Sequence, residues 1–315
     1  MTADELKGVL PYMRSMLSRA LDGRELDGEC VDPDAQNGLK APYWLHRARA
    51  TGPRPVVFEI HGGGFALGDA RKEDALCAWI RDAFDAHVVG IEYRLAPEHP
   101  FPAAVEDVLA CVNHALALLG PNADRSRLYA LGYSAGATLA CSYALTAPAR
   151  GLPQFAAMAL HYPCVDVSRA PDPSKVRACD LPVDMMGAFS ELYAGSGTDL
   201  ENPLASPARA PHELLESMPP VDFWPVHGDA LLPQAAAFCG MLREAGVSCR
   251  WHEVEGAYHG YIEDAADPVA DAAVTMPETI AARPAGWRAA AWASARESME
   301  ELLGPAVNDV PYPGL

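Results

Sequence analysis

Hydrophobic and polar residues along the chain follow two alternating patterns. Short runs rich in β-branched and aromatic residues are separated by stretches whose apolar residues recur at helical spacing. Strands are predicted over 42–47, 56–60, 88–93, 127–131, 155–162, 221–226 and 248–254. Helices are predicted over 6–21, 71–86, 103–119, 135–147, 183–193, 233–245 and 286–303. Strands that alternate with helices predict an α/β fold, with a mainly parallel sheet covered by helices on both faces.

The alternation is interrupted twice. Residues 165–220 are punctuated by prolines and predict an irregular insertion that covers a substrate pocket, although a surface excursion without a role is the alternative. Residues 264–284 are alanine-rich, acidic and aperiodic, and predict a loop or a weak helix. The predicted organisation is an N-terminal cap-helix region at 1–40, a core at 41–164 and 221–303, the cap insertion at 165–220, and a loose tail at 304–315.

Composition narrows the classes of partner. The 315 residues are half hydrophobic and carry a formal net charge of −18, which disfavours nucleic acid and anionic membranes. The pattern shows no apolar run expected to span a membrane, and the N-terminus lacks a basic region before an apolar one. The eight cysteines include no C-x-x-C pair and sit mostly among apolar neighbours. Buried free thiols and a cytoplasmic location are therefore expected.

The pentapeptide 132–136 fits the pattern G-x-S-x-G between a predicted strand and a predicted helix. A strand that turns directly into a helix holds its turn residue in a strained conformation, and Gly132 and Gly136 remove side chains that would collide there. The hydroxyl of Ser134 is then presented at the N-terminus of a helix, where free N–H groups favour negative charge. An ordinary turn rich in small residues is the alternative interpretation.

A second glycine-rich segment, His61-Gly62-Gly63-Gly64-Phe65, follows the predicted strand 56–60. Glycines at this place allow the backbone to approach a ligand closely and to direct its N–H groups toward it. A flexible turn is the alternative. A phosphate-binding loop is disfavoured, because the segment lacks the G-K-[ST] ending and does not fit G-x-G-x-x-G.

A serine nucleophile needs a base within hydrogen-bond reach and an acid to orient that base. Asp229 and His259 each follow a predicted strand, so both are expected at the sheet edge that presents Ser134. The chain order Ser, Asp, His is that of α/β-hydrolases. His259 is the predicted base and Asp229 the residue that orients it. Backbone amides of Gly63, Gly64 and Ala135 are the predicted oxyanion donors.

Other histidines and acids are weaker candidates. His161 lies at the end of a buried strand, His227 precedes the predicted acid in the chain, and His252 lies within a predicted strand. Asp166 and Asp222 are the alternative acids.

Five segments together resemble the hormone-sensitive-lipase-like esterases of the α/β-hydrolase superfamily. They are 61–65, 93–104, 132–136, 228–231 and 259–261, and the resemblance covers residues 42–261. It implies an eight-stranded sheet, a cap built from N-terminal and mid-chain segments, no metal and no organic cofactor. It also implies a serine hydrolase that cleaves small short-chain acyl esters, acetyl esters included. Phe65 and Tyr133 are the predicted substrate-binding residues.

The sequence departs from this family at two places. Tyr133 and Ala137 stand where an acidic residue and a second glycine are usual, so the polarity or support of the serine turn is altered. Pro233 and Gln234 replace an acidic pair that usually follows the orienting acid.

Two other functions use the same residues. The predicted triad also suits an amidase, a deacetylase or an acyltransferase, which share one acyl-enzyme. A non-catalytic small-molecule-binding protein is the alternative from another class; plant gibberellin receptors resemble this family but lack the histidine that His259 supplies here. The sequence leaves a homodimer open.

Overall fold

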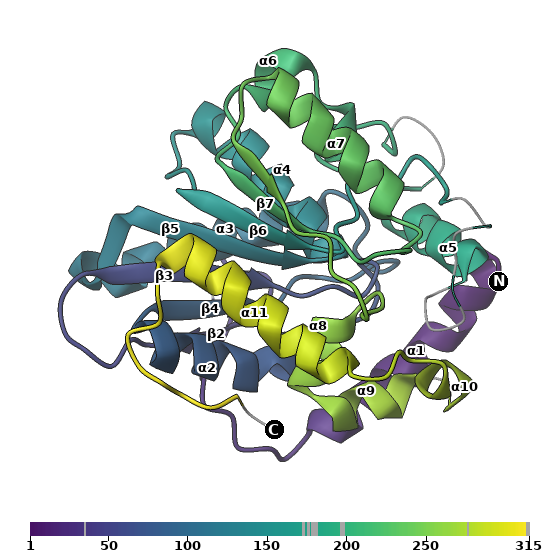
Figure 1. Ribbon diagram of the computed structural model, residues 1–315, viewed down its shortest axis with the longest axis horizontal. Helices are drawn as coiled ribbons and strands as arrows, with labels where there is room; N and C mark the ends of the chain where they lie inside the picture. Colours follow the sequence, from purple (N-terminus) through teal and green to yellow (C-terminus); the bar gives the residue numbers. More distant parts are fainter. Residues whose placement is uncertain are drawn as a thin grey trace.

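A twisted eight-stranded sheet forms the centre of the protein in the computed structural model (Figure 1). The structure describes residues 1–34, 36–171, 174, 177, 182–195, 199–275 and 277–312. The strand order is β1-β2-β4-β3-β5-β6-β7-β8. The strands are β1 (Glu29–Val31), β2 (Tyr43–His46), β3 (Arg54–Ile60), β4 (His87–Ile91), β5 (Ala123–Tyr133), β6 (Ala157–His161), β7 (Val221–Trp224) and β8 (Cys249–Trp251).

Only the edge that contains β1 and β2 is antiparallel. β2 pairs antiparallel with both β1 and β4, and every pair from β4 to β8 is parallel. The carboxyl ends of the parallel strands therefore lie at one edge of the sheet, as the sequence pattern predicts. The outermost strand at the antiparallel edge is β1, which pairs only with β2 and is largely exposed, so residues 29–31 show no hydrophobic pattern that predicts a strand.

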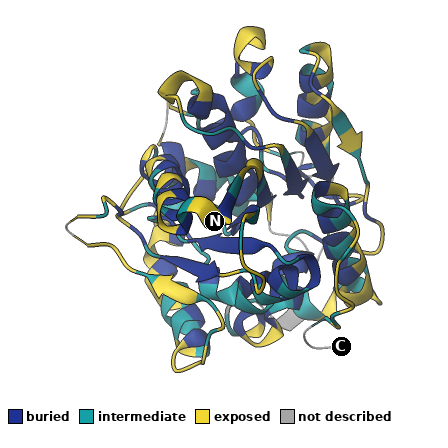
Figure 2. Cartoon of the chain, turned by 90° about the vertical axis from the view of Figure 1, so that its left-hand side faces the viewer, coloured by how far each residue is buried: buried dark blue, intermediate teal, exposed yellow. Residues whose placement is uncertain are grey.

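Helices cover both faces of the sheet, whose central strands are buried (Figure 2). Strand residues alternate between the two faces. On β3, Val56, Phe58 and Ile60 join the core beneath α3, α4 and α7, whereas Val57 faces the core beneath α2 and α11. These helices are α2 (Asp74–Phe84), α3 (Ala103–Leu119), α4 (Ala135–Arg150), α7 (Leu232–Glu244) and α11 (Trp287–Leu303). Burial on both faces explains why the central strands read as nearly continuous hydrophobic runs.

Among the described residues, six further helices lie outside these two layers, and α6 adjoins α7, far from the N-terminus (Figure 1). They are α1 (Ala3–Leu21), α5 (Val183–Ala194), α6 (His212–Leu215), α8 (Tyr261–Ala266), α9 (Pro268–Val274) and α10 (Pro277–Ala281). α1 begins with a capping box between Thr2 and Glu5, and it packs against α5 and α9 (Figure 1). The helices α1 and α5 are thus neighbours, and the cap built from N-terminal and mid-chain segments stays a prediction.

The stretch 264–284 contains the end of α8 and the helices α9 and α10, where the sequence predicts a loop or a weak helix. Local chemistry explains why a stretch without periodicity is helical. Asp267 caps α9 by accepting bonds from the amides of Val269 and Ala270, and Arg283 pairs with Asp264 and Asp271. α9 also buries Ala270 against α1. The ion pairs of Arg283 and the packing against α1 join residues that are too far apart in the sequence for a short periodicity window to include both.

Among the described residues, one helix is long and apolar enough to cross a membrane, contrary to the sequence-based expectation that no run is. Residues 103–122, which contain α3, are sufficiently long and apolar by composition. More than half of this stretch is buried inside the fold, so it has the properties of a core helix.

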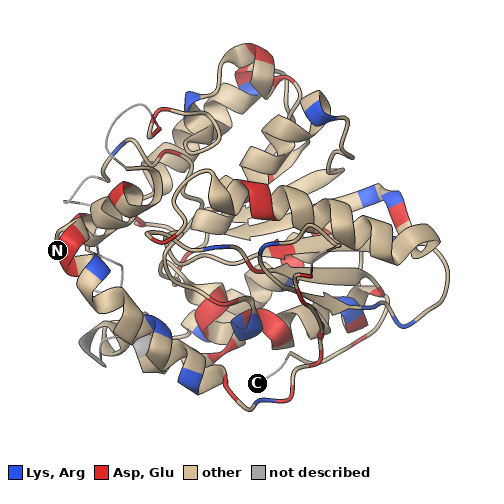
Figure 3. Cartoon of the chain, turned by 180° about the vertical axis from the view of Figure 1, so that it is seen from behind, with Lys and Arg blue, Asp and Glu red and all other residues tan. Residues whose placement is uncertain are grey.

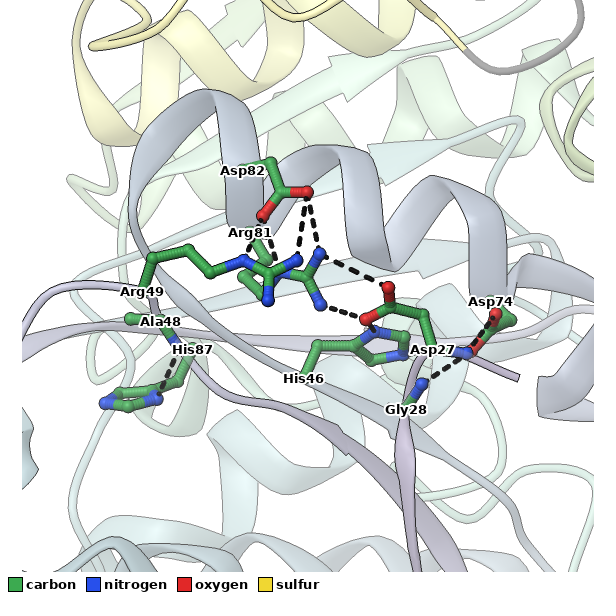
Figure 4. Close-up of polar contacts among 9 residues, drawn as sticks. All are labelled: Asp27, Gly28, His46, Ala48, Arg49, Asp74, Arg81, Asp82 and His87. Carbon is green, nitrogen blue, oxygen red and sulfur yellow. Dashed lines mark hydrogen bonds and ion pairs between the residues drawn. The ribbon is translucent and has the colours of Figure 1, made fainter. Parts of the chain in front are cut away.

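Charged residues are spread over many elements of the chain (Figure 3). One network lies at the antiparallel edge, where Arg81 on α2 pairs with Asp27 and with its neighbour Asp82 (Figure 4). His46 on β2 is buried between Asp27 and Asp74, at 3.7 and 3.4 Å, and its burial lowers its pKa. A hollow of about 510 Å³ beside this network is lined by residues of 25–27, 74–82 and 310–311, away from the predicted site. The network fastens the segment before β1 to α2.

Candidate active site

Ser134 occupies a sharp turn between β5 and α4. β5 ends at Tyr133 and α4 begins at Ala135, which leaves Ser134 alone between them with φ 48° and ψ −112°. Its amide donates to the His161 carbonyl at 3.1 Å, and its carbonyl accepts from the amide of Cys164 at 3.2 Å. A non-glycine residue with positive φ is strained, and it persists only where the surrounding structure fixes it. Backbone bonds from neighbouring β6 and the segment after it do so here.

The glycines on either side of Ser134 allow α4 to approach the sheet closely. A Cβ on Gly132 would lie 2.8 Å from the Cα of Ala137, inside the helix. A Cβ on Gly136 would lie 2.0 Å from the carbonyl oxygen of Ile60 on β3. Both positions therefore require glycine, for the reason that the motif predicts.

The structure brings Ser134, His259 and Asp229 together. His259 Nε2 lies 2.8 Å from Ser134 Oγ, and His259 Nδ1 lies 2.8 Å from Asp229 Oδ2. The side chain of Asp229 is 1% exposed and that of His259 is 8% exposed. Asp229 Oδ1 also accepts the amide of Leu231 at 2.9 Å. A buried carboxylate that holds one imidazole nitrogen leaves the other nitrogen to accept the serine proton.

The competing histidines lie elsewhere or have other partners. His161 is completely buried, and its Nε2 lies 3.2 Å from Ser298 Oγ on α11. Burial lowers the pKa of His161 to about 3, so its imidazole is neutral in the folded protein. His227 pairs with Glu253 at the surface. His252 lies just past the end of β8, rather than within a strand as predicted, and stacks on Trp224.

The alternative acids are bound to arginines. Asp166 pairs with Arg209 and Asp222 pairs with Arg250. Neither carboxylate is bonded to His259, so the geometry favours Asp229.

The glycine-rich segment after β3 turns away from the strand in a backbone conformation that favours glycine. Gly63 has φ 101° and Gly64 has φ 60°. Among the described residues, the amides of Gly63 and Gly64 have no acceptor within the protein. Ala135 is the first residue of α4, so its N–H has no partner within the helix. These three amides are available as donors, and their role as an oxyanion hole stays a prediction.

Side chains fix the start of this segment. The Tyr93 hydroxyl shares its one proton between the carbonyls of His61 and Gly62, at 3.0 and 3.1 Å, and the His61 ring stacks on Tyr93. His61 Nε2 lies 3.2 Å from Glu92 Oε1. Burial opposes charge on this imidazole, but the Glu92 carboxylate prevails and raises the pKa of His61 to about 9. His61 is therefore a charged structural partner of Glu92 at neutral pH.

Phe65 and Tyr133, the predicted substrate-binding residues, are both buried. Phe65 has φ 62° and stacks face to face on Tyr193 of α5, with ring centroids 3.7 Å apart. Tyr133 lies in the core beneath the sheet, where its ring faces those of His161 and Tyr162. The side chain of Tyr133 therefore lies within the core next to the serine turn, and the substrate-binding roles of Phe65 and Tyr133 stay predictions.

Sequence reasoning missed two residues next to the triad. Tyr162 follows β6 with φ 36°, and its ring meets that of His259 edge-on with centroids 5.0 Å apart. Glu263 on α8 accepts the Gly62 amide at 2.7 Å. The position of Glu263 four residues after His259 was the available signal, but a single glutamate at that spacing has no motif to distinguish it.

Metal-binding residues are not assembled in the part of the chain that the structure describes. No group of three or more His, Cys, Asp or Glu side chains there is arranged to hold an ion. The described cysteines are unpaired, and Cys77, Cys111, Cys141 and Cys239 are buried.

Residues 57–263 match the family model described as the alpha/beta hydrolase fold. Esterase LipI of Mycobacterium tuberculosis is 36% identical over 225 residues, covering 70% of this chain and 69% of that protein. An acetyl-hydrolase of Streptomyces hygroscopicus is 32% identical, covering 69% of this chain and 72% of its own length. Human hormone-sensitive lipase is 30% identical over 58% of this chain and 17% of its own length.

Solved structures give the same result for the fold. The structure of an esterase/lipase from an uncultured bacterium superposes with a TM-score of 0.72 at 25% identity, covering 93% of this chain and 91% of the other. The hyperthermophilic esterase from the archaeon Pyrobaculum calidifontis superposes with a TM-score of 0.69 at 26% identity, covering 90% and 95%. The chain therefore belongs to the hormone-sensitive-lipase-like esterase family of the α/β-hydrolase superfamily and is a serine hydrolase.

Proposed function

We propose that this serine hydrolase cleaves small carboxylesters with short acyl groups, acetyl esters included, through an acyl-enzyme on Ser134. The observation that carries the proposal is the pair of 2.8 Å contacts that join Ser134, His259 and Asp229 in series. Relatives named esterase and acetyl-hydrolase support ester cleavage.

In the proposed first half-reaction, Ser134 Oγ attacks the ester carbonyl carbon while His259 Nε2 accepts the hydroxyl proton. The carbonyl oxygen becomes an oxyanion, which the amides of Gly63, Gly64 and Ala135 stabilise. Collapse of this intermediate breaks the bond to the alcohol oxygen, and His259 returns the proton to the departing alcohol. The acyl group then remains on Ser134. Asp229 stabilises the imidazolium that forms in each transfer.

In the second half-reaction, water replaces the alcohol. His259 accepts a proton from water as the hydroxide attacks the acyl carbon, and a second oxyanion forms at the same amides. Collapse releases the carboxylic acid and returns the proton to Ser134 Oγ. The balance is one ester and one water consumed, and one alcohol and one acid released.

The aromatic residues of α5 are evidence for a substrate with a small acyl group. A Cβ on Gly64 would lie 2.5 Å from the ring of Phe189, so α5 rests directly on the glycine-rich segment. Tyr193 on the same helix stacks on Phe65. We propose that residues 1–40 and 165–220 form the cap and that these rings limit the space beside the oxyanion.

The test compares p-nitrophenyl acetate, butyrate and octanoate as substrates for wild type, Ser134→Ala and Ser126→Ala. Ser126 lies at the other end of β5 and bonds Asp124, so its variant is a matched control. We expect Ser134→Ala to lose hydrolysis, Ser126→Ala to retain it, and acetate or butyrate to react faster than octanoate. Equal rates for wild type and Ser134→Ala would refute the mechanism, and a preference for octanoate would refute the short-chain assignment.

A further inference from the structure

Glu263 joins two parts of the site that are distant in the sequence. It lies on α8, four residues after His259, and is nearly buried at 9% exposure. Its Oε1 accepts the amide of Gly62 at 2.7 Å, and its Oε2 accepts the hydroxyl of Tyr162 at 3.2 Å. One carboxylate thus binds the glycine-rich segment after β3 and the residue after β6.

The bond to Gly62 acts on the backbone that carries the proposed oxyanion donors. Peptide units are planar, so fixing the carbonyl of a unit also fixes the direction of its N–H. Glu263 and the Tyr93 hydroxyl hold the two ends of the unit between His61 and Gly62, at 2.7 and 3.0 Å. Tyr93 also holds the Gly62 carbonyl at 3.1 Å, and the opposite end of that unit is the Gly63 N–H. The peptide unit that carries the Gly63 N–H and the unit before it are therefore both held in place.

The contact between Gly62 and Glu263 is tight. A Cβ on Gly62 would lie 2.9 Å from Glu263 Oε2 and 3.1 Å from Oε1, so the segment rests against the carboxylate. Without the acceptor, the buried Gly62 N–H would be unsatisfied. Rotation of this peptide toward another acceptor would then lower the free energy of the segment.

The hydrogen bond to Tyr162 affects the position of the catalytic base, His259. The Tyr162 ring meets the His259 imidazole edge-on, with centroids 5.0 Å apart. The Tyr162 amide is held by the Trp224 carbonyl at 3.0 Å, and its hydroxyl is held by Glu263. The ring against which His259 packs is therefore fixed at both ends.

We propose that Glu263 is a positioning residue that sets the glycine-rich segment relative to His259 through its two hydrogen bonds. This inference rests on the proposed function and deepens it. Because Glu263 acts through Gly62 and Tyr162, it is expected to affect the stabilisation of the oxyanion and to leave ground-state binding of the ester largely unchanged.

The experiment measures kcat and KM for p-nitrophenyl acetate with Glu263→Ala, Glu263→Gln and Glu263→Asp. Glutamine keeps the length of the side chain and an oxygen acceptor for Gly62 but removes the charge. Aspartate keeps the charge but withdraws the acceptor by one methylene. We expect Glu263→Ala to lower kcat about 10- to 100-fold, with KM within about 2-fold, since loss of one whole oxyanion donor costs about 10²–10³.

We also expect Glu263→Gln to retain more activity than Glu263→Asp. This comparison separates the effect of side-chain length, which places the acceptor at Gly62, from the effect of negative charge. Tyr162→Phe keeps the ring and is expected to lose only a few-fold in kcat. Circular dichroism verifies the fold of each variant, and the Gln and Asp pair decides the matter if the alanine variant does not fold.

Three outcomes would overturn the inference: Glu263→Ala with wild-type kcat, a change confined to KM, or Glu263→Asp more active than Glu263→Gln. Failure of the proposed function is a different result, because wild type would then show no hydrolysis that depends on Ser134.

Discussion

Alanine at Gly136 tests the close approach of α4 to β3 that positions the serine turn. In Gly136→Ala, the new methyl would lie 2.0 Å from the Ile60 carbonyl oxygen and 2.6 Å from that of His61. Both distances are well inside van der Waals contact. The carbonyl of Ile60 belongs to a strand paired on both sides, with β4 and β5, so it cannot rotate away. Relief therefore requires α4 to shift outward.

The magnitude follows from two opposing effects. Overpacking in a well-packed core costs about 1–3 kcal/mol, and rigid backbone on both sides of this contact favours the upper end. Alanine in place of glycine within a helix recovers up to about 1 kcal/mol. The net loss expected for Gly136→Ala is thus about 2 kcal/mol in the free energy of unfolding.

Gly240→Ala is the matched control. Gly240 lies within α7, and no atom would come within 4 Å of its added Cβ. The same substitution is therefore expected to stabilise the protein by about 0.5–1 kcal/mol, through helix propensity alone. The two variants should change stability with opposite signs.

Urea unfolding followed by circular dichroism measures both variants, and p-nitrophenyl acetate hydrolysis reports the site. With an m-value near ~3 kcal/mol/M, a loss of about 2 kcal/mol lowers the midpoint by about 0.7 M. We expect Gly136→Ala to lose most of its activity and Gly240→Ala to keep it. A Gly136→Ala variant with a wild-type midpoint would show that α4 does not approach β3 this closely, and the account of the turn would be wrong.

Two further predictions concern the acid and a buried histidine. Asp229→Asn should lower kcat for p-nitrophenyl acetate roughly 10⁴-fold with little change in KM, because a neutral amide stabilises neither the correct tautomer nor the imidazolium; a loss under tenfold would contradict the assignment. Burial lowers the pKa of His161 to about 3, so its contribution is complete above the unfolded pKa near ~6.5 and is lost as pH falls. Between pH 7.5 and 5.5, wild type should therefore lose about 1.4 kcal/mol more than His161→Gln in urea unfolding, and equal losses would refute a neutral buried imidazole.

The sequence by itself determined the fold class and the three side chains that meet. The hydrophobic runs predicted most strands, and parallel strands place their carboxyl ends at one edge. Ser134, Asp229 and His259 each follow such a strand, so their proximity follows from topology and needs no knowledge of side-chain packing. The glycine pattern around Ser134 was equally readable, because the close approach of a helix to a strand leaves a local signature.

Only the tertiary structure decided the surroundings of those residues. Tyr133 adjoins Ser134 in the chain, but the alternation of β5 sends its ring into the core. The helices of 264–284 depend on ion pairs and on packing against α1, which periodicity within a window does not detect. Glu263 reaches Gly62 across 201 residues of sequence. Such contacts depend on how separate elements pack together. Residue type and local spacing in a single sequence do not reveal that packing.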